Sequence, residues 1–144
     1  MTSLVVAGYH LAHAQRGEFD RAQPYSVLEH ASSSPATDAA DILRQAETAI
    51  RENDQAKAAA LAAAYGKANH NPRPLFDLLL RFAVSEDGAL HAEKYYRTVS
   101  EEFGRTRSAF RWDHVVALAR VTASEQGTRA SGYEQACDLL KVKA

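Results

Sequence analysis

The sequence predicts an all-α protein, with residues 1–144 forming a single compact domain of about six or seven helices. Apolar residues recur at helical spacing along most of the chain, and no segment alternates apolar and polar residues as a half-buried strand does. Chain length and composition, with 46% hydrophobic and 24% charged residues, suit one globular domain with its own core. We therefore expect a helical bundle, or an array of antiparallel helical hairpins.

The first part of the chain predicts three helices. One covers residues 3–15 and ends before Gly17, and a short one follows Pro24, because proline suits the first helical position. The third runs from Pro35 to about residue 52, with Ser34 as its N-cap. Its apolar positions form one stripe, made of Ala39, Ile42, Leu43, Ala46, Ala49 and Ile50.

The middle of the chain predicts a hairpin and a buried helix. Asn53 or Asp54 caps the helix AKAAALAAAYGKA, whose small side chains let a neighbouring helix approach closely. The short link before it predicts an antiparallel hairpin with the preceding helix. After the break NHNPRP, residues 75–84 are apolar on every helical face, which is typical of a central buried helix.

Three further helices complete the prediction. Ser85 caps the next one, whose first turn holds Glu86 and Asp87, because a helix N-terminus favours acidic side chains. That helix ends at Gly104. The last two cover residues 110–124 and 133–141.

Net charge and cysteine content indicate which classes of partner and which cell compartment to expect. The net charge is −1 and Lys and Arg are scattered, so we expect neither nucleic acid nor a membrane surface as partner. The single cysteine, Cys137, cannot form an internal disulfide, which favours a reducing compartment. The opening residues lack the basic region of a signal peptide, and no apolar stretch reaches the ~20 residues of a membrane span. These features predict a soluble, cytoplasmic protein.

The strongest candidate for chemistry is the set Asp87, His91 and Tyr95, which a spacing of four places on one helical face. A carboxylate beside an imidazole can prepare a general base, and the pair could also supply two metal ligands. The same residues also suit an acidic first turn followed by a histidine and a tyrosine that pack on a neighbouring helix. We prefer this structural interpretation, because helix starts favour acids whatever the function.

Three other histidines are candidate metal ligands. His10 and His13 form an H-x-x-H pair, but the pair lacks the glutamate of the H-E-x-x-H metalloproteases. His70 lies in the proline-bounded break, where a histidine either serves a site or bonds to backbone carbonyls. A phosphate-binding glycine loop, a G-x-S-x-G elbow and paired zinc-binding cysteines are absent from the sequence.

Residues 69–99, NHNPRPLFDLLLRFAVSEDGALHAEKYYRTV, resemble the helical segment that follows the iron–sulfur domain in some bacterial Rieske-type proteins. In those proteins an acidic pair and a histidine likewise open a helix after a leucine-rich one. The resemblance covers residues 54–101 and rests on Pro72, Arg73, Leu75, Glu86, Asp87 and His91. One cysteine cannot supply the two that a Rieske cluster needs. The resemblance therefore implies the helical part alone, or a fragment of a longer protein.

Two functional hypotheses follow. The favoured one is a non-enzymatic domain without a cofactor, which acts through helix packing as a homodimer or as an accessory module. The alternative is a small helical redox protein that binds iron, another metal or haem through His91, Asp87 and His70, joined by His10 or His13. The sequence identifies no substrate and leaves a small-molecule ligand open.

Overall fold

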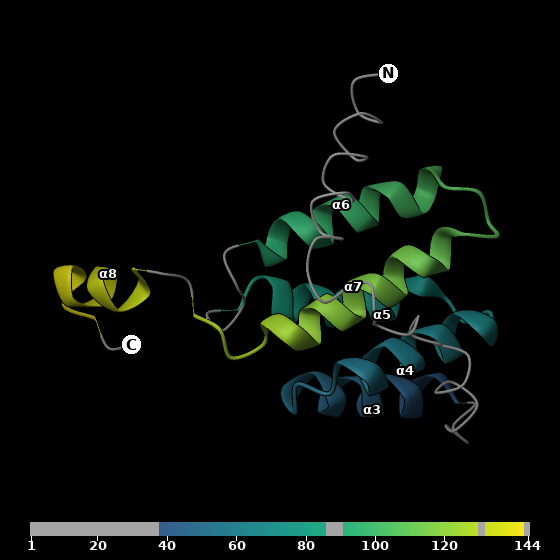
Figure 1. Cartoon of the computed structure of the whole chain (residues 1–144), viewed down its shortest axis with the longest axis horizontal. Coiled ribbons are helices and arrows are strands. Elements are labelled where there is room, and N and C mark those ends of the chain that lie inside the picture. The colour runs from purple at the N-terminus through teal and green to yellow at the C-terminus, as the bar shows by residue number, and fades with distance from the viewer. Residues whose placement is uncertain (1–37, 86–90, 130–131, 143–144) are drawn as a thin grey trace, which may run out of the picture.

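The computed structural model of the protein describes residues 38–85, 91–129 and 132–142. Every regular element within these ranges is an α-helix, which confirms the predicted all-α class. The helices are α3 (Ala39–Arg51), α4 (Gln55–Lys67), α5 (Pro72–Ala83), α6 (Ala92–Arg105), α7 (Arg111–Glu125) and α8 (Tyr133–Leu140). Helices α3 to α7 form a bundle, and α8 stands beyond one end of it (Figure 1). The helices expected over residues 3–15 and after Pro24 lie outside the described residues.

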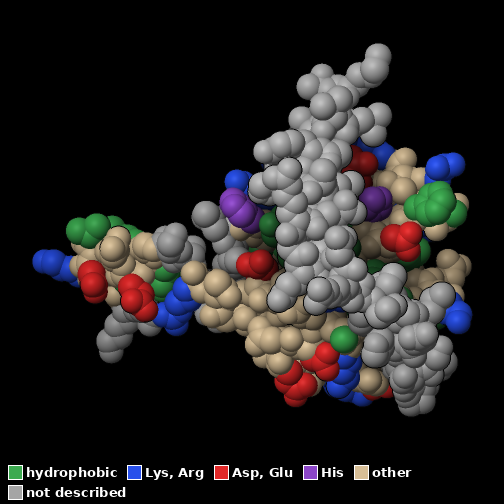
Figure 2. All heavy atoms as spheres, viewed as in Figure 1, with side chains coloured by type: hydrophobic (Ala, Val, Ile, Leu, Met, Phe, Trp, Pro, Cys, Tyr) green, Lys and Arg blue, Asp and Glu red, His purple; other side chains and the backbone are tan. Residues whose placement is uncertain are grey.

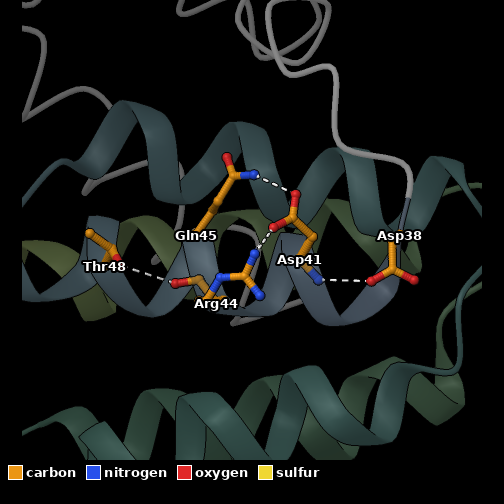
Figure 3. A network of polar contacts seen from close by, with 5 residues as sticks. All are labelled: Asp38, Asp41, Arg44, Gln45 and Thr48. Carbon is orange, nitrogen blue, oxygen red and sulfur yellow. Dashed lines mark hydrogen bonds and ion pairs between the residues drawn. The ribbon is translucent and has the colours of Figure 1, made fainter.

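Helix α3 begins later than the sequence predicts. Its N-cap is Asp38, whose carboxylate accepts a hydrogen bond from the Asp41 backbone N–H at 3.1 Å. The predicted N-cap Ser34 and the predicted first residue Pro35 lie outside the described residues. Figure 3 shows how the exposed side of α3 continues from this cap: Asp41 accepts bonds from Arg44 and Gln45, and the Thr48 hydroxyl donates to the Arg44 carbonyl. A carboxylate that can reach the first free N–H groups decides where the helix starts.

Helices α3 and α4 form the predicted hairpin. The Asp54 carboxylate caps α4 by accepting a bond from the Lys57 N–H at 2.9 Å. In the link, Asn53 has a left-handed backbone with φ of 55°. Its side-chain amide donates to the carbonyls of Ala123 and Gln126, at 3.0 and 2.7 Å. Asn53 thus satisfies carbonyl groups at the C-terminal end of α7, which no intrahelical donor can reach.

The central helix of the bundle is α7, which contacts each of α3, α4, α5 and α6, whereas the sequence predicts residues 75–84 for this place. Helix α4 contacts both α3 and α7. Its buried residues cover most of its circumference: Ala58, Ala59, Ala60, Leu61, Ala62 and Tyr65. Helix α5 instead has a polar side that exposes Arg73, Asp77 and Arg81, and Val84 at its end is exposed as well. Small side chains allow α3 and α7 to approach α4 closely from two sides.

The close approach of α4 to α7 depends on Gly66. The indole ring of Trp112 occupies the space in which a Cβ atom at position 66 would lie. Around this contact the core is completed by fully buried side chains from four helices: Ile42, Ile50, Leu61, Tyr65, Leu75, Leu79 and Val115. Within the described ranges, no helix is both long enough and apolar enough to cross a membrane.

Candidate interaction surface

Aromatic rings from four helices meet inside the bundle. The Phe103 ring contacts Phe76 and Trp112 edge to face, with centroid distances of 5.3 and 5.4 Å. Trp112 also lies 6.2 Å from the ring of Tyr65. Burial raises the pKa of Tyr65, so its hydroxyl stays protonated at neutral pH. These contacts join α4, α5, α6 and α7 and have the geometry of ordinary aromatic packing.

His70, a candidate metal ligand, lies at the edge of this aromatic cluster. Its ring centroid is 4.9 Å from that of Tyr65, and its backbone N–H donates to the Tyr65 carbonyl at 3.3 Å. The Tyr65 hydroxyl in turn donates to the Asn71 carbonyl at 2.8 Å. The contacts of His70 therefore hold the link between α4 and α5.

His91 and Tyr95 contact each other as their spacing predicts. Their rings lie edge to face, with centroids 6.4 Å apart, and both side chains are exposed. His91 is the residue before α6, which begins at Ala92 and not at Glu86. The expected cap is also wrong, because the Ser85 hydroxyl donates to the Phe82 carbonyl at 2.8 Å and so serves the end of α5.

The metal site stays a prediction. Asp87, His10 and His13 lie outside the described residues. Among the residues that the structure does describe, no three His, Cys, Asp or Glu side chains gather as a metal site requires. On the face shown in Figure 2, the histidines lie at separate positions on the surface. A further histidine, His114, has a partner of another kind, since its Nε2 lies 3.2 Å from the Thr106 hydroxyl.

The sequence did not single out a further feature, a set of exposed apolar side chains at one end of the molecule. We define the apolar end by five large side chains that are exposed there: Val84, Tyr95, Leu139, Leu140 and Val142. Val84 follows α5, Tyr95 lies in the first turn of α6, and the other three belong to α8 and the residues after it. Figure 1 shows that α6 begins, and α7 leads into α8, at this same end.

The most exposed part of the apolar end is α8. Leu139 and Leu140 are 83% and 72% exposed, and α8 makes no extensive contact with another described helix. At 100° per residue, Ala136 lies between these two leucines on one apolar arc, which continues to Tyr133 and the buried Cys137. Figure 2 shows hydrophobic side chains on the surface of α8. The acidic residues of α8 lie on its other side.

Within the described ranges one more large apolar side chain is exposed, that of Phe110, and it lies elsewhere. It precedes α7, in the turn that follows α6. The guanidinium group of Arg107 lies over its ring, 5.1 Å from the centroid, and covers part of the ring. Among the residues that the structure describes, the large apolar side chains that are more than half exposed therefore all belong to the apolar end.

No known protein family, curated protein or solved structure matches this chain. The resemblance of residues 54–101 to the helical region of Rieske-type proteins stays a prediction.

Proposed function

We propose that this protein is a non-enzymatic helical module that associates with itself through its apolar end. The observation that carries the proposal is the exposure of Leu139 and Leu140 on α8. Exposed apolar side chains that are grouped on one helix face, as on α8, mark an interaction site in a soluble domain, whereas single scattered ones do not.

The short length of α8 supports the same proposal. Isolated helices shorter than about 12–15 residues are marginal in water, and most helices in proteins are stabilised by packing of an apolar face. Helix α8 has 8 residues, and its apolar arc carries two exposed leucines. Contact with a partner would bury this arc and stabilise the helix at the same time.

The mass of the protein in solution tests the proposal. We expect size-exclusion chromatography with light scattering to show a mass that rises with concentration from 15.8 kDa towards that of two chains. A protein that keeps the mass of one chain at the highest attainable concentration would contradict self-association.

A pair of matched variants tests the surface. Leu140→Lys places a charge on the apolar arc of α8, and Asp138→Lys places the same charge on its polar side. Burying a leucine side chain contributes about 1.5–3 kcal/mol, so Leu140→Lys should weaken association by about tenfold or more. Asp138→Lys should leave the association constant nearly unchanged. Equal effects of the two substitutions would show that the apolar arc is not the contact.

The metal or haem alternative has a test of its own. Elemental analysis and a visible absorption spectrum of the purified protein would detect a stoichiometric transition metal or haem. If one is found, His91→Ala and His70→Ala variants that lose it would support that alternative, whereas variants that retain it would exclude these two histidines as ligands.

A further inference from the structure

We propose that the turn between α6 and α7 binds a phosphate group through the guanidinium groups of Arg107 and Arg111. The ligand is a small anion, either inorganic phosphate or the phosphate group of a monoester. This inference does not depend on self-association, because the turn lies at the end of the bundle away from α8 (Figure 1).

The backbone of this turn places the two arginines on one side. The Arg111 N–H donates to the Arg107 carbonyl at 3.2 Å, and the Phe110 N–H donates to the same carbonyl at 2.9 Å. The first of these bonds joins residues four apart, as in an α-helix, where side chains at this spacing are neighbours with Cβ atoms about 5–6 Å apart. Two positive charges are therefore carried by adjoining positions of one turn.

An aromatic ring contacts each of the two guanidinium groups. The group of Arg107 lies over the Phe110 ring, 5.1 Å from its centroid, and that of Arg111 lies over the Phe103 ring, 5.0 Å from its centroid. The Phe103 ring belongs to the aromatic cluster inside the bundle. Such contacts limit the rotamers of both arginines, which lowers the entropy cost of binding an anion.

No carboxylate neutralises either charge within the described ranges. Ion pairs with carboxylates are formed there by Arg44, Arg51, Arg73, Arg81, Arg97 and Arg105. The acids nearest in sequence do not serve the pair. Glu102 lies 3.7 Å from Arg105, and Asp113 comes two positions after Arg111, about 200° around α7.

Arg111 is the more costly of the two charges to leave unpaired. Its side chain is partly buried, and its Nε atom is fully buried without a hydrogen-bond partner. Removing part of a charged group from water costs free energy unless an opposite charge compensates it. An anion bound at the outer N–H groups would supply this opposite charge.

A phosphate group suits the pair in charge and in geometry. At neutral pH a phosphate monoester carries a charge of about −1.5 to −2 and three strong acceptor oxygens. A guanidinium group presents its N–H donors in a planar fork that matches phosphate in a bidentate manner. Two neighbouring guanidinium groups can therefore donate to different oxygens of one phosphate, whereas a carboxylate would neutralise only one of them.

An NMR titration of the full chain tests the site. We expect inorganic phosphate and phenyl phosphate, each added at a constant ionic strength of about 0.15 M, to shift the Nε–H signals of Arg107 and Arg111 until they saturate. Tighter binding of phenyl phosphate would assign a monoester, and tighter binding of inorganic phosphate would assign the free ion. Shifts that do not saturate with either compound would overturn the proposal.

Three variants test which arginines bind. Arg107→Gln removes an exposed charge, and Arg111→Lys keeps the charge but removes the planar fork, so each should weaken binding at least about tenfold. Arg97→Gln is the matched control, because Arg97 is also exposed but is paired with Glu101 at 3.1 Å. It should leave the affinity nearly unchanged.

The outcomes separate this site from the proposed self-association. An equal loss in Arg97→Gln would show unspecific attraction to positive charge and would overturn the site. An unchanged affinity of Arg107→Gln would also overturn it, even if Arg111→Lys failed to fold by circular dichroism. Leu140→Lys should bind phosphate like the unchanged chain, so a monomeric protein contradicts the proposed function and leaves this inference standing.

Discussion

Replacing Gly66 by alanine should destabilise the protein, although alanine is the better helix former. A Cβ atom at position 66 would lie within 2.8 Å of three ring carbons of Trp112. Carbon atoms in contact normally lie about 3.5–4.0 Å apart. The indole would therefore have to move by about an ångström. Tyr65 and Phe103 contact the same ring at 6.2 and 5.4 Å and leave it little room to do so.

Two opposing contributions to the free energy of unfolding of Gly66→Ala have known sizes. Alanine in place of glycine within a helix stabilises by about 0.5–1 kcal/mol. An added carbon in a tightly packed core costs about 1–3 kcal/mol, and the crowded indole places Gly66 near the upper figure. The expected net loss is about 2 kcal/mol, a large part of the ~5–15 kcal/mol that stabilises a typical domain.

Gly104 provides the matched control. It lies in the last turn of α6, and a Cβ atom there would meet nothing within 4 Å. Gly104→Ala should therefore stabilise by up to about 0.5 kcal/mol, because only the helix propensity changes. Urea unfolding followed by circular dichroism measures both free energies, and equal slopes in urea show that only stability has changed.

A double variant tests the cause directly. Trp112→Leu alone leaves a cavity and lowers the free energy of unfolding. In that background the added methyl of Gly66→Ala has room, so its effect should change from destabilising to neutral or stabilising. The reasoning is refuted if Gly66→Ala is as stable as Gly104→Ala, or if its cost is the same with and without the indole.

Three more predictions concern polar contacts. Asn53→Ala should lower the free energy of unfolding in urea by about 2 kcal/mol, because two hydrogen bonds to the C-terminal end of α7 are lost and alanine is strained at φ of 55°. Asn53→Gly should relieve the backbone strain but not restore the hydrogen bonds. A hydrogen bond from Arg51, with further help from a second arginine, holds the pKa of Glu47 below its usual range. The stabilisation by Glu47 is thus present above the pKa of the unfolded state and is lost as the pH falls through the pKa of the folded state. Between pH 7 and 3 the free energy of unfolding should therefore fall less steeply in Glu47→Gln than in the unchanged chain. An equal dependence on pH in the two proteins would contradict this. Tyr65→Phe removes the bond to the Asn71 carbonyl and should cost about 1 kcal/mol, measured in the same way, while no change would show that the bond contributes nothing.

Several elements of the bundle could be predicted from local sequence. Asp54 precedes a run of strong helix formers, and of the two predicted caps, Asn53 and Asp54, it is the one that caps α4. Prediction failed where two residues compete for one role. Ser34 and Asp38 both suit an N-cap, and only the structure shows that α3 begins after Asp38. The Ser85 hydroxyl likewise serves the helix before it rather than the one after it.

The candidate surface was harder to predict than the helices. His91 and Tyr95 contact each other because a spacing of four determines which side chains meet on a helix. Leu140 and Val84, in contrast, have the same apolar character as the buried Leu79. Nothing in their local sequence shows that they stay exposed.

Local sequence predicts the all-α class and most helix positions, because propensity, periodicity and capping act over a few neighbouring residues. Contacts between distant helices establish which helix is central, where Gly66 makes room for an indole ring, and which apolar residues remain uncovered. Burial depends on what lies opposite a side chain, and for most core residues that is a helix distant in the chain. For Leu139 and Leu140 on α8, the described part of this chain supplies no such covering helix.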